Sequence, residues 1–137
     1  MVTKKAVNEL AYRVIGAAIE VHKAFGPGLT EEPYESALVH ELQLRGIRVT
    51  RQQNVLLNYK GVLMDCKLRY DLLIEDLIVC ELKAVAETPP LFDAVLMTYM
   101  KILKKPKGLL FNFHVLNLQR DGLKSFVNEY FTTLPDE

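Results

Sequence analysis

Apolar residues in the first part of the chain recur at the spacing of one helix face. Between residues 4 and 25 they stand at Val7, Leu10, Ala11, Val14, Ala18, Val21 and Phe25, which is typical of an amphipathic helix. Gly26-Pro27-Gly28 interrupts the pattern and predicts the end of this helix. A second helix is expected to begin after Thr30, a common N-cap residue type, and to end at Gly46.

The hydrophobic period changes to two from Arg48 onward, which is the spacing of a strand. Turn-forming residues divide this region at Tyr59-Lys60-Gly61 and again at Glu75-Asp76. The pattern therefore predicts a meander of three strands, over residues 48–58, 61–74 and 77–84.

The last third of the chain mixes both periods. Its pattern predicts a helix over 91–104, a buried strand over 109–113, a short edge strand over 115–119 and a final helix over 121–132. The predicted order is two helices, three strands, a helix, two strands and a helix, without repeats or linkers, so the sequence predicts a layered α/β fold in one domain, residues 1–137.

Composition excludes several classes of function. The 17 Lys and Arg residues balance 17 Asp and Glu residues, so a net charge of zero gives no long-range attraction to nucleic acid, and any such binding needs a local patch. No apolar run is long enough to span a membrane, and no signal peptide is apparent, so a cytoplasmic protein is expected. Cys66 and Cys80 lack metal-ligand spacing and are expected to be buried free thiols.

Charged residues end two otherwise apolar strands. Asp71 lies late in the second predicted strand, and the third ends in Glu81-Leu82-Lys83. Because side chains alternate across a strand, Glu81 and Lys83 project to the same side, where Asp71 can join them from the neighbouring strand. Two carboxylates and an ammonium form a hard, oxygen-rich cation site suited to metal-assisted phosphodiester hydrolysis. A solvated salt bridge is the alternative interpretation, although charges beside such apolar strands are costly unless they are paired or bind a metal.

These residues and their order resemble the PD-(D/E)XK nuclease superfamily, and within it a family named after its GxxExxY motif. That motif corresponds to Gly28-Leu29-Thr30-Glu31-Glu32-Pro33-Tyr34. The resemblance extends over roughly residues 10–130 through Ile19-Glu20-Val21-His22-Lys23, Arg69-Tyr70-Asp71-Leu72-Leu73, Glu81-Leu82-Lys83-Ala84-Val85 and Phe111-Asn112-Phe113. It implies a restriction-endonuclease-like core with a central mixed sheet of four to five strands flanked by helices.

The resemblance also implies a function and the residues that perform it. Asp71, Glu81 and the main-chain carbonyl of Leu82 would hold Mg²⁺ or Mn²⁺, and Lys83 would orient a water or offset charge in the transition state. Glu31 would act in the same site, although an acid in the first turn of a helix is also favourable for the helix dipole alone. The substrate would be nucleic acid, with DNA expected over RNA.

Three further residues are candidates for substrate binding, each with an alternative structural role. Tyr34 shares a helix face with Glu31, but such a tyrosine is more often a core residue whose hydroxyl is hydrogen-bonded. Tyr99 matches a tyrosine of the family and could bind a phosphate or pack. Lys101 belongs to a basic cluster with Lys104, Lys105 and Lys107 that could follow a phosphate backbone or simply stabilise the end of a helix.

One departure from the family separates the functional alternatives. Where the family usually has a His-Glu-Ala-Gln run, this chain has Phe92-Asp93-Ala94-Val95, so two polar groups have become apolar. An active nuclease is the favoured hypothesis, because Asp71, Glu81 and Lys83 are intact. A catalytically degenerate module that binds nucleic acid or a protein partner is the second, and an unrelated metal-dependent hydrolase is the third. With no specificity domain, the chain is expected to act as a homodimer or with a partner protein.

Overall fold

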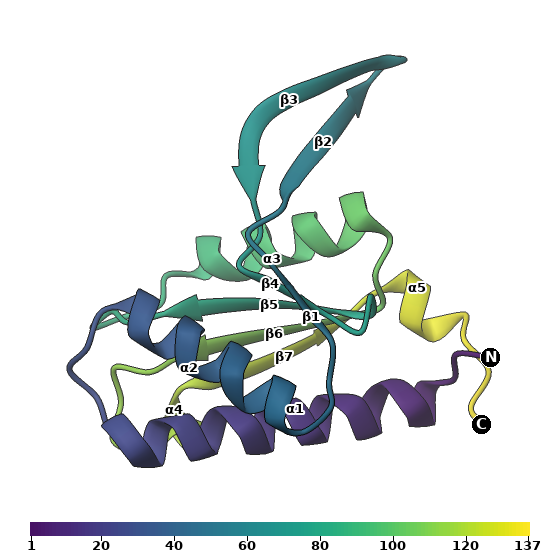
Figure 1. The fold of residues 1–137 in the computed structure, drawn as a ribbon. Helices are drawn as coiled ribbons and strands as arrows, with labels where there is room; N and C mark the ends of the chain where they lie inside the picture. Colours follow the sequence, from purple (N-terminus) through teal and green to yellow (C-terminus); the bar gives the residue numbers. More distant parts are fainter.

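The computed structural model describes residues 1–137 and contains five helices and seven strands (Figure 1). None of the helices is both long and apolar enough to cross a bilayer. In chain order, the elements are α1 (Lys4–Phe25), α2 (Glu31–Leu44), β1 (Val49–Arg51), β2 (Asn54–Tyr59), β3 (Val62–Arg69), β4 (Leu72–Ile74), β5 (Ile78–Lys83), α3 (Pro90–Leu103), β6 (Lys107–Asn112), α4 (Leu118–Asp121), β7 (Leu123–Val127) and α5 (Glu129–Thr132).

Five of the strands form one mixed sheet in the order β1-β4-β5-β6-β7. Strands β5 and β6 run parallel, joined by the crossover helix α3, and the other neighbours run antiparallel. The predicted α/β class, with a central mixed sheet flanked by helices, is confirmed.

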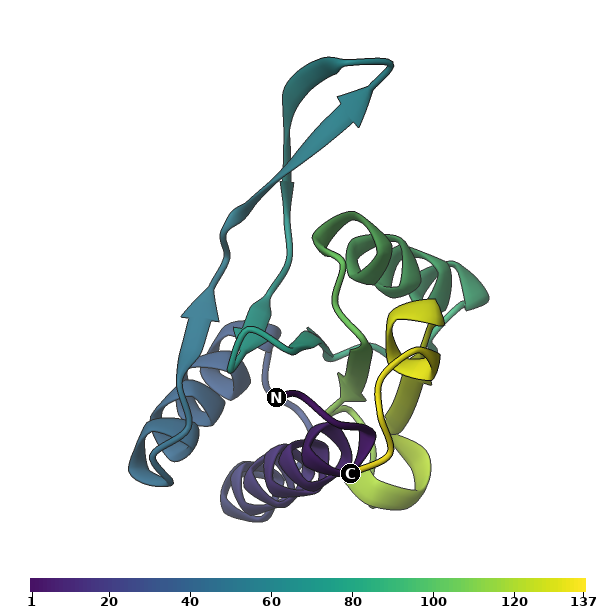
Figure 2. The ribbon, with the colours of Figure 1, turned by 90° about the vertical axis from the view of Figure 1, so that its right-hand side faces the viewer.

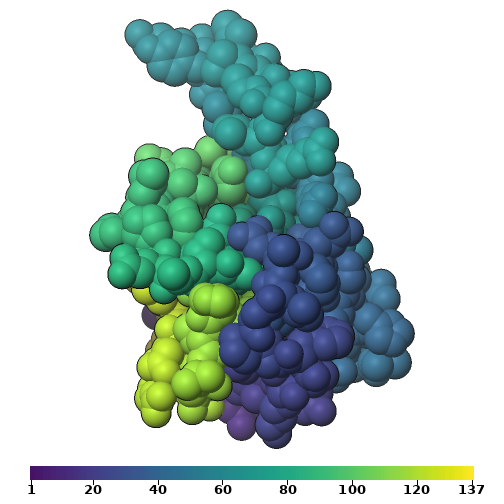
Figure 3. All heavy atoms as spheres, turned by 90° about the vertical axis from the view of Figure 1, so that its left-hand side faces the viewer, coloured from purple at the N-terminus to yellow at the C-terminus, as the bar shows by residue number.

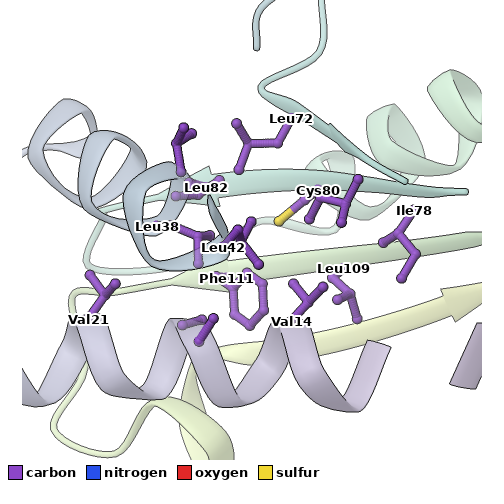
Figure 4. Packing of buried hydrophobic residues seen from close by; sticks show 14 of the residues in the cluster. Val14, Val21, Leu38, Leu42, Leu72, Ile78, Cys80, Leu82, Leu109 and Phe111 are labelled. Carbon is purple, nitrogen blue, oxygen red and sulfur yellow. The ribbon is translucent and has the colours of Figure 1, made fainter. Parts of the chain in front are cut away.

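Helices cover both faces of this sheet, and the alternation of side chains along β5 assigns its residues to the two sides. Ile78, Cys80 and Leu82 pack in the larger core against α1 and α2 (Figure 4). Val79 packs in the smaller core with Leu96 and Met100 of α3. Strand β5 is therefore buried on both faces, which explains its nearly continuous apolar sequence.

The first two predicted strands, 48–58 and 61–74, are each divided in the structure. Their outer parts, β1 and β4, pair within the main sheet, whereas β2 and β3 pair only with each other and project from the body as a ribbon (Figures 1 and 2). The chain bends at Gln52, whose φ is 46°, and at Tyr70-Asp71, between β3 and β4. Gln52 N–H donates a hydrogen bond to the Asp71 carbonyl at 2.9 Å, so the two bends are fastened together.

The last two predicted elements are wrong. The segment 115–119, predicted as a strand, contains a loop and the start of α4, and the helix predicted over 121–132 is replaced by β7 and the short α5. The apolar positions there fit a helical period, but β6 offers an unpaired edge whose backbone groups need partners. Strand β7 satisfies that edge by pairing antiparallel with β6, and this tertiary requirement overrides the local pattern.

Both predicted hairpin turns are present. Lys60 and Gly61 have φ of 51° and 88°, and Glu75 and Asp76 have φ of 50° and 57°. Two successive residues with positive φ match the twist of antiparallel strands, which is why such turns join β2 to β3 and β4 to β5.

The two cysteines differ in their environment. Cys80 is buried in β5, as predicted, but Cys66 is exposed. The prediction for Cys66 is wrong because β3 pairs only with β2, and most of its side chains, Cys66 among them, are exposed.

Candidate active site

The centre of the candidate site is the free edge of β5 beyond the end of β4. Leu72, the first residue of β4, pairs with Cys80, so the main chain of β5 has no strand partner on that side at Leu82. The side chain of Asp71 takes the place of the missing strand, because its Oδ2 accepts a hydrogen bond from Leu82 N–H at 2.8 Å. In return, Asp71 N–H donates to Glu81 Oε1 at 3.2 Å. Asp71 and Glu81 are thus held side by side by backbone hydrogen bonds.

Successive side chains at this end of β5 lie on opposite faces of the sheet. Glu81 and Lys83 pair in register with Leu110 and Asn112 of β6 and lie on the α3 side of the sheet, whereas Leu82 lies on the side of α1 and α2. The main-chain carbonyl of Leu82 points to the same side of the strand as its N–H, toward Asp71. Asp71, at the bend before β4, contacts residues of both faces, because its N–H binds Glu81 and its carboxylate binds the N–H of Leu82.

Glu81 is buried, with only 6% of its surface exposed. The pKa of Glu81 is raised to about 9, chiefly by burial and then by the charge of Asp71 and a hydrogen bond with its side chain, against a smaller lowering by a backbone hydrogen bond from Asp71 and by the Lys83 ammonium. The Tyr99 phenol also has a raised pKa, first from burial and then from the charges of Glu81 and Asp71. Tyr99 is partly buried against the smaller core, on the α3 side of the sheet, and lines a separate cavity with Leu68 and Val95.

A cavity of about 310 Å³ opens on the other side of Asp71. Figure 3 shows this face of the molecule, with the start of α2 in dark blue beside the green segment that follows β5. The lining is strongly acidic and includes one cation; it consists of Glu31, Glu32, Glu35, Arg51, Gln52, Asp71 and Leu82. Glu31 thus shares a cavity with Asp71 and Leu82, although it lies on α2, some forty residues earlier in the chain.

Sequence reasoning missed the role of Glu35 in this cavity. Its carboxylate is buried and accepts hydrogen bonds from Arg51 Nη2 at 2.7 Å and Gln52 Nε2 at 2.9 Å. These contacts fasten the first bend of the ribbon to α2 and hold the Arg51 guanidinium at the cavity wall. The available signal was the position of Glu35, four residues after Glu31 and hence on the same helix face.

Asn112 was also missed as a structural part of the site. Its side chain accepts hydrogen bonds from the N–H groups of Val85 and His114 and donates one to the Val85 carbonyl at 2.9 Å. It therefore fixes the chain that leaves β5 after Lys83.

Two of the candidate substrate-binding residues lie elsewhere. Tyr34 is fully buried and stacks on Phe113 with ring centroids 4.4 Å apart. Its hydroxyl donates to the Gly26 carbonyl and accepts from Leu29 N–H, so it holds the glycine loop before α2. Lys101 is exposed on α3 and lines a separate cavity beside α5, so the structure does not bring it to Asp71.

The donor set at Asp71 and Glu81 fits a hard divalent cation. The structure contains no group of three or more His, Cys, Asp or Glu side chains arranged to hold a metal. Mg²⁺, however, is usually bound by one or two carboxylates and completes its shell with water and substrate oxygens. Two adjacent carboxylates and the Leu82 carbonyl have the composition of such a site.

Comparison with known proteins gives one match. A family model described as the PD-(D/E)XK nuclease superfamily matches residues 8–125, which is most of the chain. The observed mixed sheet with flanking helices is consistent with a restriction-endonuclease-like fold. No curated protein and no solved structure matches the chain.

Proposed function

This chain belongs to the PD-(D/E)XK nuclease superfamily, and from that premise we propose that it hydrolyses phosphodiester bonds in nucleic acid. Membership indicates a nuclease-like function and nucleic-acid binding in general, and nucleases of this superfamily generally use divalent metals. The proposed ion is Mg²⁺ or Mn²⁺, the proposed substrate is DNA rather than RNA, and the proposed subfamily is the one with the GxxExxY motif.

The observation that carries the proposal is the pair of hydrogen bonds, each from a backbone N–H to a carboxylate, that joins Asp71 to Glu81 and Leu82. A merely solvated salt bridge would leave these carboxylates exposed, yet Glu81 is buried and belongs to none of the seven ion pairs of the structure. Two acids held together on a rigid sheet edge, one of them (Asp71) at the wall of an open cavity, are arranged for a cation that would stabilise their ionised forms.

In the proposed site, Asp71, Glu81 and the Leu82 carbonyl hold the metal. When bound, a divalent ion acts as a Lewis acid toward a phosphoryl oxygen. The Lys83 ammonium donates hydrogen bonds to the charge that develops on the reacting phosphate. Glu31 orients the attacking water from the α2 side of the cavity.

The test is cleavage of plasmid DNA and of a labelled RNA in Mg²⁺ or Mn²⁺, with EDTA as the metal-free condition. Lys83→Ala should lower the cleavage rate by about 10²–10³-fold, because it removes one donor to the transition state, while Mn²⁺ binding measured by calorimetry persists. Asp71→Ala and Glu81→Ala should lose both cleavage and Mn²⁺ binding.

Glu9→Gln serves as the matched control, because Glu9 is an exposed acid on α1 and its loss should leave both readouts unchanged. Equal cleavage by wild type and all three site variants would reveal a contaminating nuclease. Wild-type protein that binds nucleic acid without cutting it would support the degenerate binding module.

A further inference from the structure

The Lys83 ammonium lies over the face of an aromatic ring. Its Nζ lies 4.5 Å from the centroid of Phe92, within the range of a cation–π interaction. None of the hydrogen bonds or ion pairs between side chains of the structure involves Lys83. Resting on the proposed function, we infer that Phe92 is a positioning residue that holds the Lys83 ammonium where the reaction needs it.

The ring is itself firmly placed. Phe92 lies in the first turn of α3, where Pro90 restricts the backbone and Phe92 N–H donates to the Pro89 carbonyl at 3.0 Å. The Phe92 side chain is half-buried against the smaller core, which also contains Leu96. The helix start is anchored a second time, because Asp93 forms an ion pair with Lys124 of β7 at 3.2 Å.

The ion pair with Lys124 keeps the Asp93 carboxylate from pairing with Lys83. Asp93 is adjacent to Phe92 in the chain, but its carboxylate is engaged with Lys124. Asp93 is therefore engaged elsewhere, Glu81 acts on Lys83 through its charge without forming an ion pair, and the Phe92 ring is in direct contact with the ammonium.

An aromatic partner suits a lysine that has to act on a substrate. A carboxylate partner would accept hydrogen bonds from the ammonium and offset its charge. The face of a ring attracts the charge without accepting conventional hydrogen bonds, so the N–H donors of Lys83 stay available for a phosphate oxygen or a water. The apolar residue at position 92 is then a functional feature of this chain, in contrast to the lost polar group that the family pattern suggests.

The test compares Phe92→Leu, which removes the ring, with Phe92→Tyr, which keeps it. The first readout is NMR of the Lys83 side chain. Its ε-methylene protons lie near the ring face and should be shifted upfield in the wild type and in Phe92→Tyr, and this shift should be lost in Phe92→Leu. Leu91→Ala is the matched control, because Leu91 is the exposed neighbour of Phe92 and its removal should leave the Lys83 signals unchanged.

The second readout is steady-state cleavage. In Phe92→Leu, kcat should fall by about two- to thirtyfold, the range to which cation–π free energies correspond, while KM and Mn²⁺ affinity stay unchanged. Phe92→Tyr should retain the wild-type kcat. Phe92→Met repeats both measurements if thermal unfolding shows that Phe92→Leu does not fold.

Unchanged Lys83 signals in Phe92→Leu would overturn the inference, and so would a lost shift with an unchanged kcat. The NMR readout needs no activity. In protein that cleaves nothing, a ring-dependent Lys83 shift would still support the positioning contact, while the proposed nuclease function would fail by itself.

Discussion

Strand β5 and the β2–β3 ribbon (Asn54–Arg69) are both rich in apolar residues, yet β5 is buried and most of the ribbon is exposed. Every residue of β5 from Ile78 to Leu82 is buried. On the ribbon, exposure reaches 67% at Leu63, 62% at Tyr59 and 60% at Val62. The difference is not one of hydrophobicity. Strand β5 pairs with β6 along its whole length and with β4 along its first half, and helices cover both of its faces, whereas the ribbon has no third strand.

The same difference decides what a charged residue can do in each region. On the ribbon, Lys60 and Lys67 are exposed to water, where charges interact weakly. At the end of β5, Glu81 is buried beside Asp71, and the pKa of Glu81 is raised to about 9 as a result. The proposed chemistry therefore lies at the end of the buried strand, where the protein can alter the properties of a side chain.

The largest effect should come from removing volume at the centre of the sheet. Ile78→Ala, at a fully buried position of β5, should lower the free energy of unfolding by about 2–5 kcal/mol, because it deletes buried methyl groups and leaves a cavity. Urea unfolding followed by circular dichroism measures this change. A loss below 1 kcal/mol would mean that the side chains around Ile78 are less tightly packed than the burial of β5 indicates.

An intermediate effect should appear in the pH dependence of stability without metal. The pKa of Glu81 is raised above its ordinary value of 4.5 to about 9 in the folded protein, so between these values the folded state binds a proton that the unfolded state lacks. The free energy of unfolding should therefore fall as pH rises, by up to about 1.4 kcal/mol per pH unit. Glu81→Gln should remove this slope.

The measurement is urea unfolding at several pH values between 5 and 8.5, in EDTA. Leu63→Ala is the control, because it alters no ionisable group and should keep the wild-type slope. Equal slopes in wild type and Glu81→Gln would show that Glu81 is not the group responsible.

The smallest effect should come from the ribbon. Leu63→Ala, on a side chain that is mostly exposed, should change the free energy of unfolding by less than about 0.5 kcal/mol, measured beside Ile78→Ala under the same conditions. A loss comparable to that of Ile78→Ala would reveal that the ribbon is covered in solution, for example by a second copy of the chain, and hence that it does not differ from β5 in burial.

Much of the fold was predictable because it depends on local patterns. The helical period and its stop signals place α1 and α2 close to their observed bounds, and Glu75-Asp76 marks the turn between β4 and β5. In the candidate site, alternation along the third predicted strand correctly puts Glu81 and Lys83 on one face. The metal-binding and catalytic roles of these residues stay predictions.

The sequence itself determined the periods of most helices and strands in this protein and the positions of the turns. It also determined that two acids and a lysine lie beside β5. Each of these properties depends on residues only a few positions apart. Only the tertiary structure decided that residues 48–74 divide into sheet and ribbon, that β7 replaces a helix, and that Phe92 lies against Lys83. The physical reason is that unpaired strand edges and side-chain contacts involve residues distant in the chain, and the local pattern contains no information about which of them will meet.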